Sequence, residues 1–281
     1  MIKMIATDLD GTLLHPKRPF TLVSRQNLKF LQGFVSAGGK VTLITGRDTS
    51  FCAKIIRKLN VPCDIISYTG SVIIRNEEVF SEKFIPGDIA VELHETLNKY
   101  KRRFARVYML KDKQFLSNGF EYSIFVRFIM FLMNVKKIRY YDPIKFSKKY
   151  FRENFNKDSK VCKMMILFFK PQKEKILEEL KPVFEKYKDE LEFQISQNCI
   201  EITKKGCNKG ERLEELVRSY GLNNSEIAVV GDDGNDISMF QKFENSFAIK
   251  SGTKELVDIA KYVVKDISEL TEHLKELNVD L

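Results

Sequence analysis

The chain has 281 residues, of which 43% are hydrophobic and 30% charged, so we expect one large or two smaller globular domains with a substantial core. No apolar run approaches the roughly 20 residues of a membrane-spanning helix, and the first strand begins directly after the N-terminus, which argues against a signal peptide. The five cysteines form no C-x-x-C pair and the three histidines lie far apart. We therefore expect reduced thiols, a cytoplasmic location, and neither a zinc site nor a histidine-based triad.

The net charge of +9 comes from the middle of the chain. Residues 84–195 carry 24 Lys/Arg and 15 Asp/Glu, whereas the two flanking segments together are neutral. Such a basic field attracts anions, including phosphate esters, nucleotides and nucleic acid. A solvated lysine-rich surface explains the same counts, so both interpretations stay open.

The first 83 residues alternate strands and helices. Ser24 is placed to cap the first helix, and Gly38-Gly39 to end it. The predicted elements are a strand at 2–6, that helix, a strand at 41–44, a helix at 49–59, a strand at 64–67, and a hairpin of 72–74 with 79–80. The order β-α-β-α-β indicates a parallel sheet with right-handed crossovers.

A second texture follows, from 84 to 195. Helical patterns at 89–100 and 173–187 alternate with strand-like runs at 105–110, 161–169 and 192–195, and the segment 120–157 gives no readable pattern. We interpret this stretch as a second αβ unit inserted into the first.

The first texture resumes at 196. The predicted elements are strands at 199–202, 227–230, 246–249 and 262–264, helices at 211–220 and 254–260, a helix ending near Phe240, and a terminal helix capped by Asp266 or Ser268. The predicted fold is therefore α/β, with a Rossmann-like parallel-sheet core formed by 1–83 and 196–281 and an inserted αβ domain at 84–195.

Polar side chains follow three of the predicted strands at their carboxyl ends. Asp8 and Asp10 come after the first strand, Thr45 after the second, and Asp232, Asp233 and Asp236 after the strand at 227–230. Ligands of open α/β sheets bind at this edge. Several carboxylates converging there need a positive partner, and they are typical ligands of Mg²⁺.

Four motifs occur in a fixed order along the chain: Asp8-Leu9-Asp10-Gly11-Thr12, Thr45-Gly46-Arg47, Lys209-Gly210, and Gly231-Asp232-Asp233-Gly234-Asn235-Asp236. Their order and their places on strand ends resemble the haloacid dehalogenase (HAD) superfamily, and the last motif resembles its Cof-type branch. That branch carries a large αβ cap after the third strand, where this chain has its insertion. The motifs cover about 170 residues at the two ends of the chain, and the cap matches by position and length only.

The resemblance implies a Mg²⁺-dependent phosphohydrolase, and it assigns each motif residue a role. Asp8 would be the nucleophile that forms an aspartyl-phosphate, and Asp10 the general acid and base. Asp8, Asp232 and the Asp10 backbone carbonyl would hold the metal, with Asp236 a ligand or an outer acceptor. The phosphoryl oxygens would be held by the amides of Leu9 and Gly46 and by Thr45, Lys209 and Asn235. Asp233 and Arg47 are interpreted as surface residues.

The sequence departs from the branch at Thr69-Gly70, where many members carry Asn-Gly. Cap residues would choose the leaving group, and Arg103, Arg106, Arg127 and Lys163 are candidates to bind a second anionic group of the substrate.

Three functions fit these residues. The first is a phosphatase for small phosphorylated metabolites such as sugar phosphates, pyridoxal phosphate or a flavin nucleotide. The second is a phosphomutase with the same intermediate. The third is a polyanion-binding protein that uses the basic aromatic segment 136–160, although no nucleic-acid motif is present and an intact acid/base pair would be idle. We predict the first, acting on a small phosphorylated substrate without a membrane or nucleic-acid partner, and either a monomer or a dimer fits the sequence.

Overall fold

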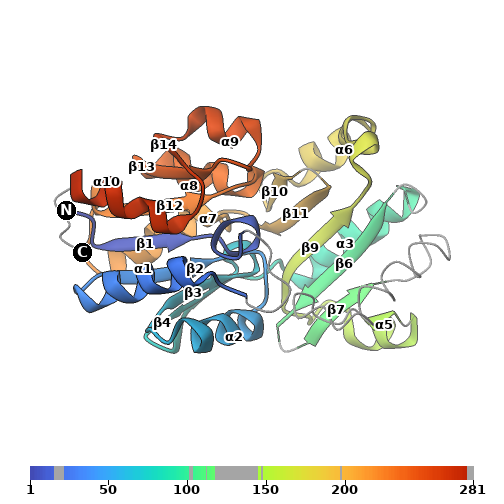
Figure 1. The fold of residues 1–281 in the computed structure, drawn as a ribbon. Helices are drawn as coiled ribbons and strands as arrows, with labels where there is room; N and C mark the ends of the chain where they lie inside the picture. Colours follow the sequence, from blue (N-terminus) through green and yellow to red (C-terminus); the bar gives the residue numbers. More distant parts are fainter. Residues whose placement is uncertain are drawn as a thin grey trace. The chain divides into compact units, whose positions relative to one another are not determined.

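The structure is a computed structural model that describes residues 1–15, 22–100, 104–111, 113–117, 145–146, 148–196 and 198–276. It contains two compact units, one formed by 1–82 with 206–281 and the other by 83–205 (Figure 1). The first unit is therefore discontinuous in sequence, and the second is inserted after its strand β5, Glu78–Glu82.

In the first unit, the described residues form an eight-stranded sheet in the order β14-β13-β12-β1-β2-β3-β4-β5. The strands from β14 to β3 run parallel, whereas β4 and β5 form an antiparallel hairpin at one edge. Their bounds are β1 Met4–Thr7, β2 Lys40–Ile44, β3 Asp64–Ser67, β4 Val72–Arg75, β5 Glu78–Glu82, β12 Ile227–Gly231, β13 Asn245–Ile249 and β14 Tyr262–Val264. Strand β1 lies between β2 and β12, which places the ends of these three strands side by side.

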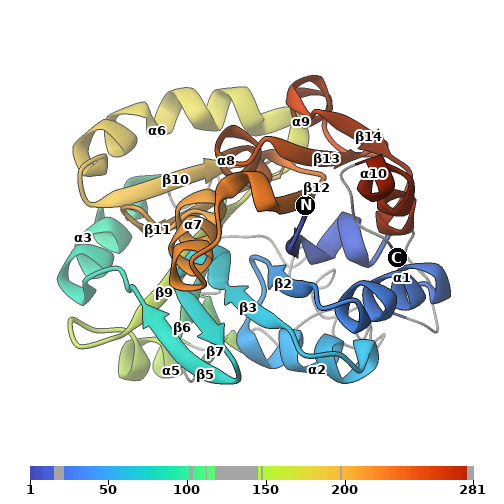
Figure 2. The same ribbon diagram turned by 90° about the vertical axis from the view of Figure 1, so that its left-hand side faces the viewer.

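The helices described in this unit cover both faces of the sheet (Figure 2). They are α1 Arg25–Ser36, α2 Thr49–Leu59, α7 Lys209–Ser219, α8 Ile237–Lys242, α9 Lys254–Ile259 and α10 Leu270–Glu276. Ser24 caps α1 by accepting a hydrogen bond from the Asn27 amide, as predicted. Apolar side chains of α7 and α8 pack with alternate residues of β1, such as Met4 and Ala6, in one buried cluster. This packing fixes α7, and with it Lys209 at its first residue.

The second unit is built on a separate sheet. Its described strands lie in the order β10-β11-β9-β6-β7-β8, antiparallel except for β7 with β8. The bounds are α3 Gly87–Leu97, β6 Ala105–Leu110, β7 Lys113–Ser117, β8 Lys145–Phe146, α5 Lys148–Asn154, β9 Val161–Leu167, α6 Lys173–Tyr187, β10 Leu191–Ile195 and β11 Cys199–Lys204. Helices α3 and α6 pack on this sheet through an apolar cluster of their own.

The second unit ends later than the sequence pattern predicts. We expected the run beginning at Cys199 to return to the first sheet. In the structure it is β11, which pairs with β9 and β10, and the second unit extends to Lys205. A short run that alternates apolar and polar residues fits either sheet, because its partners are set by distant strands.

Two of the four candidate anion-binding residues of the second unit are described and buried. Arg106 donates to the carbonyl oxygen of His94 and to Asn98 Oδ1, and Lys163 forms an ion pair with Glu201 at 2.7 Å. Arg103 and Arg127 lie outside the described residues, as do 136–144 and 147 of the segment 136–160.

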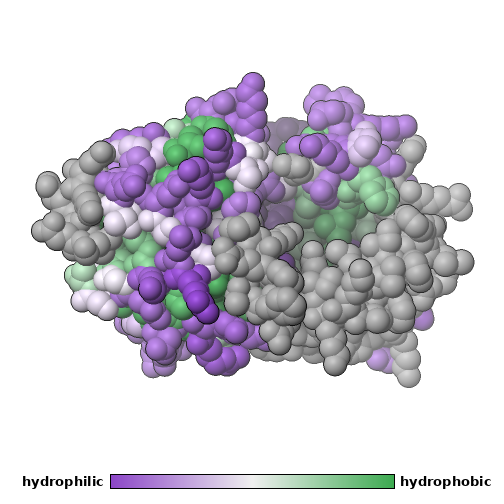
Figure 3. All heavy atoms as spheres, viewed as in Figure 1, coloured by the Kyte–Doolittle hydropathy of each residue, from purple (hydrophilic) through white to green (hydrophobic). Residues whose placement is uncertain are grey.

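The coloured atoms on the face drawn in Figure 3 are mostly hydrophilic, in line with the high content of charged residues. Over the described part of the chain, no helix is both long and apolar enough to cross a membrane.

Candidate active site

The predicted motif residues of the first unit meet at the carboxyl edge of its sheet. The amide of Asp8 donates to the Val230 carbonyl oxygen at 3.0 Å, which joins the end of β1 to β12. Beyond Asp8 the chain leaves the strand and forms a tight turn over Leu9–Leu13. Asp8 and Asp10 therefore do not continue along one face of an extended strand, and their carboxylates find different partners.

Lys209 joins two of the carboxylates. Its side chain is fully buried, and Nζ lies 2.7 Å from Asp8 Oδ1 and 2.5 Å from Asp236 Oδ1. Burial alone would lower the pKa of Lys209, but the charges of Asp236 and Asp8 outweigh it and raise the pKa above its usual value. The lysine is therefore a fixed positive charge between two carboxyl groups, one directly after β1 and the other in the turn that follows β12.

The negative charge of the carboxylates in this cluster still exceeds the positive charge around them. Oxygens of Asp8, Asp232 and Asp236 all lie within 4.8 Å of one another. Burial raises the pKa of Asp232 to about 7, with a further contribution from the charge of Asp236. Burial likewise raises the pKa of Asp8 well above its usual value, although Lys209 opposes the shift. A divalent cation would supply the missing charge, and carboxylate oxygens are the ligands that Mg²⁺ prefers, so the residues fit this ion.

Asp236 is engaged on both of its oxygens. Oδ1 accepts from Lys209, and Oδ2 accepts from the amides of Asp232 and Asp233 at 2.9 and 3.1 Å. The Asp236 carboxylate thus orders the loop that presents Asp232. Of the two expected roles for Asp236, direct metal ligand or outer hydrogen-bond acceptor, these contacts favour the second. Asp233 itself caps the turn Gly234–Asp236 by accepting from the Gly234 amide.

Asp232 is held against the first motif. Thr12 Oγ1 donates to Asp232 Oδ1 at 2.7 Å. Gly11 has φ = 94°, and a Cβ on it would lie 2.2 Å from Asp232 Oδ2. The close approach of this backbone to the carboxylate therefore requires glycine at position 11.

Asp10 is held by Arg47, a residue that the sequence did not place in the site. Arg47 Nε lies 2.7 Å from Asp10 Oδ2, and Nη2 lies 2.8 Å from Asp10 Oδ1. This two-pronged geometry fixes the plane of the carboxylate as well as its position. The side chain of Asp10 remains partly exposed, which leaves it accessible to a substrate.

The remaining predicted residues lie around the same edge. Thr45 is buried, and its Oγ1 accepts from the Arg47 amide at 3.2 Å. The side chain of Leu9 is buried in the core, so only its backbone can serve a ligand. Gly46 follows Thr45, and Asn235 lies in the turn before α8. The structure thus brings Asp8, Lys209, Asp232 and Asp236 into direct or near contact and arranges the others beside them.

The turn at Thr69-Gly70, where the sequence differs from the Asn-Gly of the Cof-type branch, is strained. Tyr68, Thr69 and Gly70 all have positive φ, of 51°, 57° and 108°. A β-branched residue such as threonine rarely adopts this left-handed conformation. The amides of Tyr68 and Thr69 donate to the carbonyl oxygens of Arg47 and Thr45, each at 2.9 Å. The strained turn therefore supports the backbone of Thr45 and Arg47, just beyond the end of β2.

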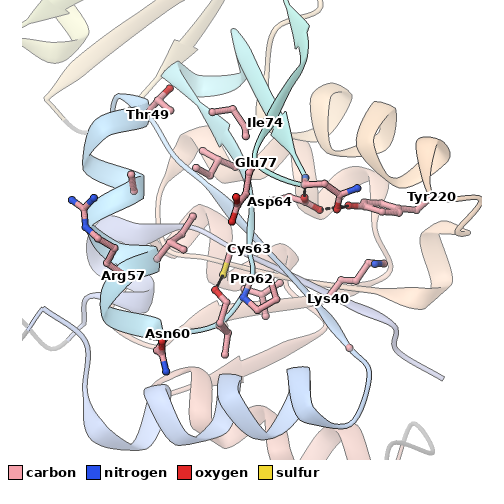
Figure 4. Close-up of a pocket in the computed structure, with 17 residues that line it drawn as sticks. Lys40, Thr49, Arg57, Asn60, Pro62, Cys63, Asp64, Ile74, Glu77 and Tyr220 are labelled. Carbon is pink, nitrogen blue, oxygen red and sulfur yellow. Dashed lines mark hydrogen bonds between the residues drawn. The ribbon is translucent and has the colours of Figure 1, made fainter.

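A groove lies at the opposite, amino edge of the same sheet (Figure 4). Its volume is about 690 Å³, and its lining includes Lys40 and Asp64, which begin β2 and β3, together with Tyr220. Asp64 accepts from Tyr220 Oη at 2.8 Å. None of the nine predicted site residues, all of which are described, lines this groove.

Comparison with known proteins identifies the family. The profile of the haloacid dehalogenase-like hydrolases matches residues 5–270. The chain belongs to this family. It is an enzyme, a phosphoric monoester hydrolase of the superfamily, and the predicted α/β core with an inserted cap is confirmed.

Individual relatives span almost the whole chain. A putative phosphatase of Mycoplasma pneumoniae is 29% identical over 91% of this chain and 90% of its own length. The 5-amino-6-(5-phospho-D-ribitylamino)uracil phosphatase YwtE of Bacillus subtilis is 24% identical over 95% and 94%. Among solved structures, a haloacid dehalogenase-like hydrolase from B. subtilis has a TM-score of 0.77 at 20% identity, covering 97% of this chain and 100% of that one. The HAD subclass IIB sugar phosphatase BT4131 has a TM-score of 0.75 at 19% identity, covering 97% and 99%.

Proposed function

We propose that the chain is a Mg²⁺-dependent phosphatase for small phosphorylated metabolites, acting through an aspartyl-phosphate on Asp8. The observation that carries the proposal is the contact of Asp8 with buried Lys209, while a second carboxylate, Asp10, is held separately by Arg47. One carboxylate thus lies beside a fixed cation that favours its ionised form, and the other is accessible and oriented for proton transfer. The two chemical roles have two different environments.

In the first step, an Asp8 carboxylate oxygen forms a bond to phosphorus and the ester P–O bond breaks. Asp10 gives its proton to the leaving oxygen, so an alcohol departs. Lys209, Thr45, Asn235 and the amides of Leu9 and Gly46 bind the phosphoryl oxygens as charge develops on them. In the second step, water attacks the phosphorus, Asp10 takes its proton, and the bond to Asp8 breaks to release inorganic phosphate.

Asp8, Asp232 and the backbone carbonyl of Asp10 would hold Mg²⁺, with Asp236 as an outer acceptor. When bound, the ion offsets the excess carboxylate charge and stabilises negative charge on a phosphoryl oxygen. Burial raises the pKa values of Asp8 and Asp232, and the positive charge of the ion would oppose this shift and favour their ionised forms, which supports the assignment.

The proposed substrate class is that of sugar phosphates, pyridoxal phosphate and flavin nucleotides. Two relatives are named as a 5-amino-6-(5-phospho-D-ribitylamino)uracil phosphatase and a phosphoglycolate phosphatase, and one structural neighbour is named as a sugar phosphatase. The phosphate esters in these names therefore belong in the test panel as well. The five scattered cysteines form no C-x-x-C pair, and this pattern supports the reducing, cytoplasmic compartment that we propose.

The test is release of inorganic phosphate from this panel by the full chain, with Mg²⁺ and with EDTA. Asp8→Asn is the inactive variant, and Asp258→Asn, an exposed carboxylate on α9, is the matched control. We expect Mg²⁺-dependent release by the wild type and Asp258→Asn, and none by Asp8→Asn. Conversion of a sugar phosphate to its isomer without release would indicate the phosphomutase instead, and no turnover of any ester by folded, Mg²⁺-loaded protein would reject the proposal.

A further inference from the structure

A fully buried arginine binds three separate elements of the first unit together. Arg212 lies on α7, and its Nε donates to the Gly70 carbonyl oxygen at 2.6 Å. Nη2 donates to Ser81 on β5, to Oγ at 3.0 Å and to the carbonyl oxygen at 3.3 Å. Nη1 forms an ion pair with Glu215 on the next turn of α7. The guanidinium therefore satisfies acceptors on a helix, a strand and a turn.

The turn that Arg212 holds is the strained one. Residues 68–70 all have positive φ, and the amides of Tyr68 and Thr69 bind the carbonyl oxygens of Arg47 and Thr45. The side chain of Arg212 passes so close that a Cβ on Gly70 would lie 2.7 Å from its Cγ. A turn that is locally unfavourable persists only when its surroundings fix it, and Arg212 supplies a strong, charged hydrogen bond at its end.

The same arginine is coupled to the catalytic lysine through the helix. Lys209 lies three residues before Arg212 on α7, about one helical turn away, so the two side chains share a face. Anchoring Arg212 to β5 and to Gly70 therefore fixes the rotation of the helix end that carries Lys209. One side chain thus helps to position two groups that would bind the phosphoryl oxygens, Lys209 through α7 and Thr45 through the turn.

A purely structural role would not call for arginine here. Burying a cation is costly, and an apolar side chain would fill the space between α7 and the sheet more favourably. Lysine, as a point charge, could not reach the acceptors on three elements at once. We propose that Arg212 is a positioning residue, which holds the left-handed turn 68–70 and α7 in the arrangement that the phosphoryl site needs. This proposal rests on the function proposed above.

The experiment is a double-mutant cycle between Arg212→Met and Thr69→Asn. Asparagine adopts the left-handed conformation more readily than threonine, so it should hold the turn without the arginine. The control is Arg218→Met, the same substitution on the same helix, at an exposed arginine paired with Glu214. Two readouts are measured in the full chain: kcat and KM for the best ester of the panel, and amide hydrogen exchange of the peptide covering residues 67–71.

We expect Arg212→Met to lower kcat about tenfold or more with a much smaller change in KM, because misplaced groups act mainly on the transition state. Exchange in 67–71 should rise in the same variant, and adding Thr69→Asn should restore a large part of both. Arg218→Met should match the wild type. A folded Arg212→Met with unchanged kcat and exchange would overturn the proposal, and so would a loss of kcat that Thr69→Asn does not restore.

If Arg212→Met does not fold, Arg212→Lys and Ser81→Ala are measured in the same way. Ser81→Ala removes one hydrogen-bond acceptor of Arg212 and should raise amide exchange in 67–71 selectively. Unchanged exchange in both variants would overturn the proposed positioning role of Arg212. Exchange needs no substrate. A wild type that hydrolyses no ester would therefore reject the proposed phosphatase, while the cycle measured by exchange would still test Arg212.

Discussion

Arg47 binds the carboxylate of Asp10 through two parallel hydrogen bonds, from Nε to Oδ2 at 2.7 Å and from Nη2 to Oδ1 at 2.8 Å. The guanidinium also lies over the ring of Phe51, 4.8 Å from its centroid. Arg47 is thus itself held in place, and it fixes the plane in which Asp10 would give and take a proton. The orientation of the proposed acid and base depends on a residue from the neighbouring strand end.

Replacing Arg47 should therefore slow the chemical steps. We expect Arg47→Met to lower kcat about 10- to 100-fold, because proton transfer depends on the position of the carboxylate. Arg47→Lys should recover only part of this loss, since an ammonium group cannot bind both oxygens in one plane. The measurement is steady-state phosphate release with the best ester of the panel.

Arg57→Met is the matched control for Arg47. Arg57 is exposed near the end of α2, and its replacement should leave kcat within about twofold. The effect of Arg47→Met should also vanish in an Asp10→Asn background, because residues that act as one unit are not additive. Additive losses would mean that Arg47 acts independently of Asp10.

Removing Lys209 should destabilise the first unit as well as inactivate it. Lys209→Met leaves Asp8 and Asp236 buried without their cation, and breaking a buried pair in this way costs about 3–5 kcal/mol. The loss should be smaller at pH 5 than at pH 7.5, since the pKa of Asp8 is already raised by burial and this carboxylate can take up a proton. Urea unfolding in EDTA measures the difference.

Lys242→Met provides the comparison for Lys209→Met. Lys242 pairs with Glu211 and Glu214, but its side chain is partly exposed, so its removal should cost about 1 kcal/mol or less. Equal losses for the two lysines would show that the charge of Lys209 is not required by buried carboxylates.

Most of the carboxylate cluster could be predicted from the sequence. Asp8 and Asp232 each follow an apolar run that forms a parallel strand, and parallel strands end at the same edge of a sheet. That rule brings the two aspartates together without any knowledge of side-chain contacts. Lys209 precedes a glycine close to the start of the predicted helix at 211–220, and α7 begins at Lys209.

Contacts between distant side chains could not be predicted in the same way. Arg47 is 37 residues from Asp10, and an arginine near the start of a helix resembles a solvated one. Arg212 lies on a helix rich in charged residues, so the pattern favours exposure, whereas its side chain is fully buried. Strand β11 was assigned to the wrong sheet for a similar reason, since its partners are β9 and β10. The one sequence signal for the strained turn was the unusual Thr69-Gly70 itself.

A methyl group on Gly11 should displace Asp232 from the site. The Cβ of Gly11→Ala would lie 2.2 Å from Asp232 Oδ2 at φ = 94°, so the carboxylate must move. We expect loss of Mg²⁺ binding and of phosphate release, with a destabilisation of about 2 kcal/mol from strain and displacement together. Isothermal titration with Mg²⁺ and thermal unfolding in EDTA measure the two effects separately.

Gly206→Ala separates backbone strain from displacement. Gly206 also has positive φ, of 73°, but a Cβ there would meet no heavy atom within 4 Å. This variant should lose about 1 kcal/mol of stability from strain and bind Mg²⁺ like the wild type. Normal Mg²⁺ binding by Gly11→Ala would show that Asp232 is not a ligand or that the loop absorbs the methyl group.

The second unit should become less stable in mild acid because of His94. Its Nδ1 lies 2.6 Å from Tyr108 Oη, among the rings of Tyr108, Phe151 and Phe155. Burial, with a smaller contribution from the charge of Arg106, lowers the pKa of His94 from 6.5 to about 4. The unfolded chain therefore binds a proton between pH 6.5 and pH 4 that the folded protein does not, so stability falls as the pH is lowered through this range. With allowance for the partial exposure of the ring, the loss should be about 1–2 kcal/mol.

Urea unfolding between pH 4 and 7.5 should show this slope in the wild type and a reduced one in His94→Gln, which accepts a hydrogen bond from Tyr108 but does not titrate. Substitution of His15, which belongs to the other unit, should leave the slope of the second unit unchanged, and parallel curves for wild type and His94→Gln would mean that the folded protein holds His94 protonated.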